Sequence, residues 1–165
     1  MATEIEKKFL IQNDDWRGIV EGKAYAQGYL STETNQTVRV RTIGTIGFLT
    51  IKSKTIGETR LEFEYEIPIE DANEMLEELC GKPLISKIRY KIPFEGFVWE
   101  VDEFSGENDG LIFAEIELHH EGETFDKPHW IGDEVTGDPR YYNSNLIKNP
   151  FKNWPSFAGH AKSEK

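Results

Sequence analysis

The sequence has one cysteine, no long apolar run and no excess of positive charge. Cys80 alone cannot form an internal disulfide, which favours a reducing compartment. No stretch approaches the roughly 18 apolar residues of a membrane-spanning helix. The opening MATEIEKKFL contains no apolar signal region and no cleavage pattern. We therefore expect a soluble, cytoplasmic protein that has no membrane partner.

The formal net charge of −11 argues against a broad nucleic-acid partner, because phosphate backbones attract basic surfaces. A local basic pocket is still compatible with that charge. The glycines form no phosphate-binding loop of the type GxxxxGK[ST]. The length predicts a single domain over residues 1–155 and a disordered tail at 156–165.

Alternation of apolar and polar residues with a period of two, which is typical of strands, dominates the chain. It covers residues 2–11, 25–30, 37–43, 47–54, 59–67, 84–94, 97–104 and 111–118. Helical spacing is seen at 69–79 and more weakly at 13–21, and two short helices are expected within 131–146. We expect a mainly β (α+β) fold in which about seven or eight antiparallel strands form a barrel or a strongly curved sheet, with a few flanking helices.

Charges of one sign share strand faces, as Glu4 with Glu6 and Arg39 with Arg41 do. Such neighbours lie roughly 6–7 Å apart, and at an effective dielectric near 20 they repel by roughly 2–3 kcal/mol. One interpretation is an ordinary half-buried sheet with its charges in water. The other is a barrel whose polar faces line a common interior. There, carboxylates would bind a divalent cation and basic residues would bind phosphate, which together favour a metal-bound polyphosphate.

The segment Glu4-Ile5-Glu6-Lys7-Lys8 resembles the ExExK motif of the CYTH, or triphosphate tunnel metalloenzyme, superfamily. Further elements match in order across residues 2–150: Gln27-Gly28-Tyr29-Leu30, Arg39-Val40-Arg41, Thr50-Ile51-Lys52, Arg60 with Glu62 and Glu64, Lys87-Ile88-Arg89-Tyr90, Glu100 with Asp102, Glu115-Ile116-Glu117, and Glu134-Val135-Thr136 with Tyr141 and Asn143. In length and spacing the chain is similar to the short bacterial members, which are inorganic triphosphatases.

The resemblance implies a closed eight-stranded antiparallel β-barrel, or tunnel. It also implies hydrolysis of inorganic tripolyphosphate to pyrophosphate and phosphate, with Mg²⁺ or Mn²⁺ as cofactor. It places the metal on Glu4, Glu6, Glu115 and Glu117, and the phosphates on Arg39, Arg41, Lys52, Lys87 and Arg89. Lys8 and Tyr29 would form a catalytic dyad that assists the attacking water. Three acidic positions, Glu62, Glu64 and Asp102, would bind metal, hold a basic residue or order water.

Other functions stay open at this point. The same superfamily contains adenylyl cyclases and thiamine triphosphatases, which need a site for an organic ring. Aromatic residues of the tail could stack on such a ring or pack over a tunnel end: Trp130, Tyr141, Tyr142 and Trp154. A sensor that binds polyphosphate or nucleotides without turnover is a candidate from another class. Apolar strand faces that point outward also leave a homodimer open.

Overall fold

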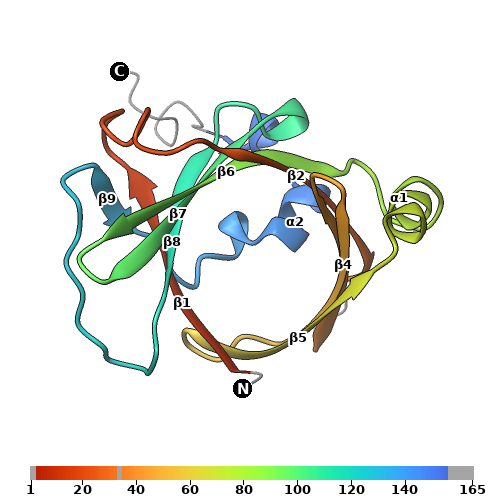
Figure 1. Ribbon diagram of the computed structural model, residues 1–165, viewed down its shortest axis with the longest axis horizontal. Helices are drawn as coiled ribbons and strands as arrows, with labels where there is room; N and C mark the ends of the chain where they lie inside the picture. The colour runs from red at the N-terminus through yellow and green to blue at the C-terminus, as the bar shows by residue number, and fades with distance from the viewer. Residues whose placement is uncertain (1–2, 33–34, 156–165) are drawn as a thin grey trace.

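Eight antiparallel strands close into a barrel around a central lumen (Figure 1). The computed structural model describes residues 3–32 and 35–155, so the tail expected at 156–165 lies outside the described part of the chain. The barrel strands are β1 (Thr3–Ile11), β2 (Lys23–Ser31), β3 (Gln36–Ile43), β4 (Ile46–Ser53), β5 (Thr59–Ile67), β6 (Ile85–Phe94), β7 (Phe97–Phe104) and β8 (Ile112–Glu117). The closed eight-stranded barrel implied by the resemblance is confirmed.

The first strand closes the barrel, because β1 lies between β5 and β8. The strands β2 to β5 form one meander, β6 to β8 form a second, and β2 pairs with β6 to join them. Strand β1 pairs with β8 from Glu6 to Leu10, but with β5 only from Thr3 to Ile5. Its C-terminal part pairs instead with the short strand β9 (Ile131–Glu134), which branches from the barrel.

The outward faces of the strands are covered by different segments. Helix α1 (Ile69–Glu78) packs Ala72 and Leu76 onto Val40 of β3. A second cluster surrounds Trp99 on β7 and includes Trp16 and Trp130. The weak helical pattern at 13–21 is wrong as a prediction: the segment forms turns that carry Trp16 onto the barrel. Burial of each large apolar side chain in these clusters contributes about 1.5–3 kcal/mol.

The tail closes one end of the barrel. Figure 1 shows helix α2 (Asn143–Lys148) across the barrel opening. Buried side chains of the tail, Tyr141, Leu146 and Trp154 among them, pack on the inward-facing Phe113. We call residues 139–154 the plug. None of the helices in the described ranges is long and apolar enough to cross a bilayer.

One expectation for the tail is confirmed and one needs correction. Two short helices lie where they were expected, the 3₁₀ helix at 139–141 and α2, and they follow residues 131–134, which pair with β1 as strand β9. Trp130 belongs to the outer cluster on β7 and does not pack over the tunnel end. Tyr141 and Trp154 do pack there, and both are buried.

Close packing of β2 against the end of α1 depends on Gly28. A Cβ atom at this position would lie 2.7 Å from Leu84 Cδ2 and 2.8 Å from Cys80 Cβ. We expect Gly28→Ala to lower the free energy of unfolding by about 1–3 kcal/mol, because the core must shift to admit the methyl group. Gly81→Ala is the matched control, since no atom lies within 4 Å of its added Cβ. Equal denaturant midpoints for the two variants would contradict this explanation.

Candidate active site

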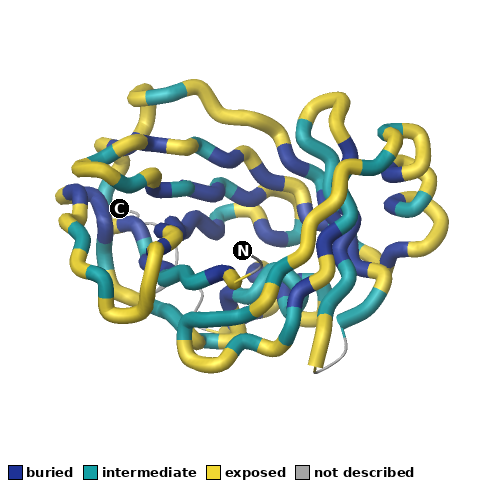
Figure 2. The backbone as a smooth tube through the Cα atoms, turned by 60° about the horizontal axis from the view of Figure 1, so that its bottom comes forward, coloured by how far each residue is buried: buried dark blue, intermediate teal, exposed yellow. Residues whose placement is uncertain are grey.

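The lumen is a cavity of about 380 Å³ that receives side chains from all eight barrel strands and from the plug. Its lining carries as many lysine and arginine as glutamate side chains, although the chain as a whole is strongly acidic. Figure 2 shows how buried and exposed positions alternate along the strands that enclose it. The structure thus brings nearly all the predicted site residues together: Glu4, Glu6, Lys8, Tyr29, Arg39, Arg41, Lys52, Glu62, Glu64, Lys87, Arg89, Glu115 and Glu117.

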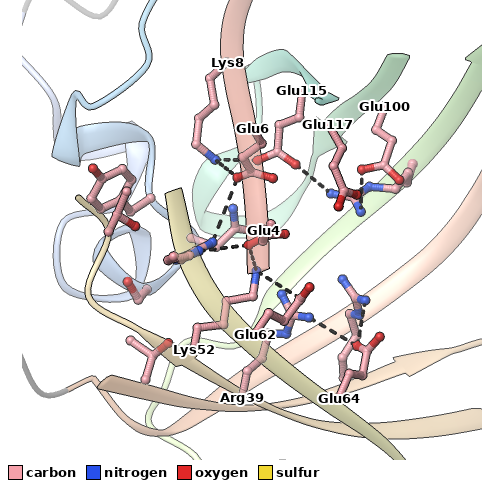
Figure 3. A pocket seen from close by; sticks show the side chains of 18 of the residues that line it. Glu4, Glu6, Lys8, Arg39, Lys52, Glu62, Glu64, Glu100, Glu115 and Glu117 are labelled. Atoms are coloured by element: carbon pink, nitrogen blue, oxygen red, sulfur yellow. Dashed lines mark hydrogen bonds and ion pairs between the residues drawn. The ribbon is translucent and has the colours of Figure 1, made fainter. Parts of the chain in front are cut away.

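Carboxylates gather where β1, β7 and β8 adjoin (Figure 3). Glu6 pairs directly across the ladder with Glu117, and Glu115 pairs with Glu100. Like charges in such positions destabilise a sheet unless a cation lies between them. The best-compensated member is Glu115, which accepts hydrogen bonds from Lys8 and from Arg89 and whose pKa is held well below its usual value. The carboxylate of Glu4 accepts a hydrogen bond of 2.9 Å from Arg60. Arg60 lies on the inward face of β5, and its pairing with Glu4 is a contact that the sequence reading did not include.

The incomplete compensation is visible in Glu6. Burial, with the nearby Glu115 carboxylate as the second cause, raises the pKa of Glu6 to about 7. No cluster of three acidic, histidine or cysteine side chains in the described ranges is already drawn together as a metal site. The donor chemistry nevertheless fits a hard divalent cation, because these groups are carboxylate oxygens with excess negative charge.

Lys8 lies against this acidic group. Its ammonium donates to Glu115 and lies 3.7 Å from Glu6 Oε1. Burial alone would lower the pKa of Lys8, but the two carboxylates outweigh burial and raise it above 10.5. Lys8 is therefore protonated at neutral pH in this arrangement. It can donate hydrogen bonds to oxygen atoms in the lumen, whereas accepting a proton would require the carboxylates to be neutralised.

A buried aspartate holds two of the basic residues. Asp102 is 0% exposed and lies behind the lumen, where Arg89 donates to both of its oxygens at 2.8 Å and Lys87 donates to one at 2.8 Å. The forked geometry fixes the guanidinium in one orientation. Burial lowers the pKa of Lys87 to about 7, although Asp102 opposes the shift. Of the roles considered for Asp102, its contacts favour the holding of basic side chains.

A second basic group lies on β3 and β4. Arg39 and Arg41 share Glu64, at 3.5 Å and 3.1 Å, and the Nε atom of each arginine is buried without a partner. Burial and the neighbouring Arg39 and Arg89 lower the pKa of Arg41 to about 10. Lys52 lies 3.6 Å from Glu62 (Figure 3). The positive charge on this side exceeds what its carboxylates compensate, which favours the binding of an anion.

The raised pKa of Glu6 predicts how stability depends on pH. Between about 4.5 and 7 the folded protein holds a proton on Glu6 that the unfolded chain has released, so stability falls as the pH rises through this window. Glu6→Gln removes this titration. Between pH 4.5 and pH 8 we expect the variant to gain about 2–3 kcal/mol relative to the wild type. Urea unfolding with a chelator present measures the difference, and parallel pH profiles would contradict it.

Comparison with known proteins gives a consistent result. The sequence profile of the CYTH domain matches residues 2–142. The chain is similar to the inorganic triphosphatase of Acetivibrio thermocellus, with 57% identity over 154 residues that make up 93% of this chain and 99% of the relative. It is also similar to the inorganic triphosphatase of Nitrosomonas europaea, with 37% identity over 153 residues that cover 87% and 96% of the two chains.

A solved structure shares the barrel. The crystal structure of the inorganic triphosphatase NE1496 aligns with a TM-score of 0.64 and 33% identity. The alignment covers 89% of this chain and 95% of that chain. The likeness in fold therefore extends over nearly the whole of both chains.

Proposed function

Because the chain belongs to the CYTH domain family, we propose that it is a triphosphatase that hydrolyses inorganic tripolyphosphate to pyrophosphate and phosphate. The observation that carries the proposal is the separation of charge in the lumen. A cation with too little compensation, Arg41, lies on β3, and the carboxylates with raised pKa values, Glu6 and Glu117, lie on β1 and β8. A polyphosphate bound together with a cation would satisfy both groups, whereas a bare metal or a bare anion would satisfy only one.

Five basic side chains are assigned to the phosphate oxygens: Arg39, Arg41, Lys52, Lys87 and Arg89. Hydrogen bonds between charged groups are roughly twice as strong as neutral ones, and arginine adds forked contacts. Phosphoryl transfer depends on placement and on neutralisation of charge more than on covalent chemistry by the protein. Placement and neutralisation of charge would both come from residues that are already in position. These are Lys87 and Arg89, which Asp102 holds, and the two arginines of β3.

Four carboxylates, Glu4, Glu6, Glu115 and Glu117, are assigned to Mg²⁺ or Mn²⁺, and Glu62 and Glu64 could contribute directly or through ordered water. A bound divalent ion would neutralise phosphate charge and lower the pKa of a coordinated water. Lys8 and Tyr29 are assigned to the attacking water. Since Glu115 and Glu6 keep Lys8 protonated, we assign it to orienting the water and to stabilising charge on the phosphoryl oxygens.

Two alternatives gain little from the geometry. Adenylyl cyclase and thiamine triphosphatase activities both require a surface for an organic ring. Tyr141 and Trp154 are buried inside the plug, and of the tail aromatics considered for this role Tyr142 alone lines the lumen. A sensor without turnover would use the same lumen, and only turnover distinguishes it.

A homodimer also stays a prediction. The outward side chains of Leu61, Phe63 and Tyr65 on β5 are 47%, 43% and 59% exposed, and a mass from light scattering would test it.

The first test is phosphate release from tripolyphosphate with Mg²⁺ or Mn²⁺ and again with a chelator. We expect turnover with metal and its loss on chelation, because the carboxylates would otherwise repel the polyanion. ATP, thiamine triphosphate and long-chain polyphosphate, assayed in the same panel, would rank the substrates. Activity that does not depend on metal, or no activity on any triphosphate, would contradict the proposal. Cyclic AMP formed from ATP faster than phosphate from tripolyphosphate would favour the cyclase.

The second test concerns Arg39. We expect Arg39→Ala to raise the Michaelis constant for tripolyphosphate at least tenfold, since a charged hydrogen bond contributes about 1.5–3 kcal/mol. Glu62→Ala should raise it less, because it removes no direct donor to phosphate. Lys152→Ala is the control for a general loss of positive charge, since this side chain is 55% exposed and does not line the lumen. Equal increases for Arg39→Ala and Glu62→Ala would contradict the ranking.

A further inference from the structure

A chain of hydrogen bonds links the plug to two of the proposed site residues at the closed end of the lumen. Lys87 donates to Asn143 Oδ1 at 3.2 Å. Gln27 donates to the same Oδ1 atom at 3.1 Å and to the Tyr29 hydroxyl at 3.4 Å. Asn143 begins α2, whereas Gln27 and Tyr29 lie on β2. Three separate segments are therefore joined in one relay, from Lys87 through Asn143 and Gln27 to Tyr29.

The direction of this relay follows from its first member. In its protonated form, which predominates below its pKa of about 7, Lys87 has only donors, so Asn143 presents its oxygen to it. Gln27 can then approach that oxygen only with its amide nitrogen. The same nitrogen reaches the oxygen of Tyr29. The hydroxyl hydrogen of Tyr29 must consequently point elsewhere, and the open space that Tyr29 lines is the lumen.

Packing alone does not explain Gln27. Its side chain is 0% exposed, and its Oε1 atom is buried without a partner. A buried polar atom left in this way costs about 1–3 kcal/mol. An apolar residue of similar size would avoid the cost. The amide of Gln27 is thus present although it lowers stability, as expected for a group whose role is to orient another side chain.

We propose that Gln27 and Asn143 are positioning residues for hydrolysis: they aim the Tyr29 hydroxyl into the lumen, and the plug is part of the active site through Asn143. The inference rests on the proposed triphosphatase function. The distance of 3.4 Å between Gln27 and Tyr29 is long, and catalytic hydrogen bonds commonly tighten only when substrate binds. Neither residue donates to the substrate itself in this scheme.

The first experiment compares two substitutions at one position with tripolyphosphate and Mg²⁺. Asn143→Asp keeps an acceptor oxygen for Lys87 and Gln27, so kcat should stay within about threefold of the wild type. Asn143→Leu removes the acceptor, and kcat should fall at least about tenfold while KM changes by less than about threefold. Equal kcat values for the two variants, or a change confined to KM, would overturn the proposal.

The second experiment asks whether Gln27 acts through Tyr29. Gln27→Leu should lower kcat at least about tenfold in the wild-type background and should have no further effect in the Tyr29→Phe background, because the hydroxyl to be oriented is gone. A loss of the same size in both backgrounds would overturn the role of Gln27. If Gln27→Leu does not fold, Gln27→Glu retains the shape and replaces the donor nitrogen with oxygen, and it serves the same comparison.

Control measurements distinguish a failure of the positioning role from a failure of the proposed function and from a loss of folding. Asn145→Ala, on the same helix, removes a hydrogen bond to Pro139 and should leave kcat unchanged. Melting temperatures by circular dichroism identify any variant whose loss reflects unfolding. If the wild type itself does not hydrolyse tripolyphosphate, the proposed function fails. If the wild type is active and Asn143→Leu is equally active and folded, the positioning role alone fails.

Discussion

The enclosure of ionic side chains inside a closed barrel is the constraint on which the rest of the structure depends. A charge removed from water is costly unless an opposite charge and hydrogen bonds satisfy it. Most lumen residues meet this demand, as the forked contact of Arg89 with Asp102 shows. Glu6 and Arg41 meet it incompletely, and their pKa values move in the direction that favours the neutral form. The site is therefore preorganised, with remaining charge of each sign for a ligand to compensate.

The inward face of the barrel changes character along each strand. Phe113 precedes Glu115 on β8, and Ile85 precedes Lys87 on β6, each pair sharing one face. The apolar members pack on the plug, whereas the charged members line the lumen. The apolar layer that stabilises the fold and the charged layer that lines the lumen thus follow one another inside the same barrel. The plug belongs to both, since α2 buries Leu146 in the apolar layer and presents Asn143 to the polar one.

The sequence predicted the site best where the backbone repeats with a fixed period, as it does in a β-strand. Because alternate residues of a strand share a face, the alternation at Glu4, Glu6 and Lys8 was enough to place these residues on one face, which the closed barrel turns toward the lumen. The alternation could not show that Asp102 lies behind the lumen, because depth depends on neighbouring strands. The plug has no regular period. The contact between Gln27 and Asn143 spans 116 positions, and only the closed fold brings the two residues together.

The position of β1 has a consequence for biosynthesis. Strand β1 hydrogen-bonds to β8, whose residues emerge from the ribosome more than a hundred positions later, and to β5. Contacts so distant in sequence form late, because closing a long loop costs chain entropy before the contacts that it allows can stabilise the fold. A nascent chain therefore keeps its ionic strand faces hydrated until most of the polypeptide has left the ribosome. The cost of withdrawing those groups from water arises in the step that also assembles their partners.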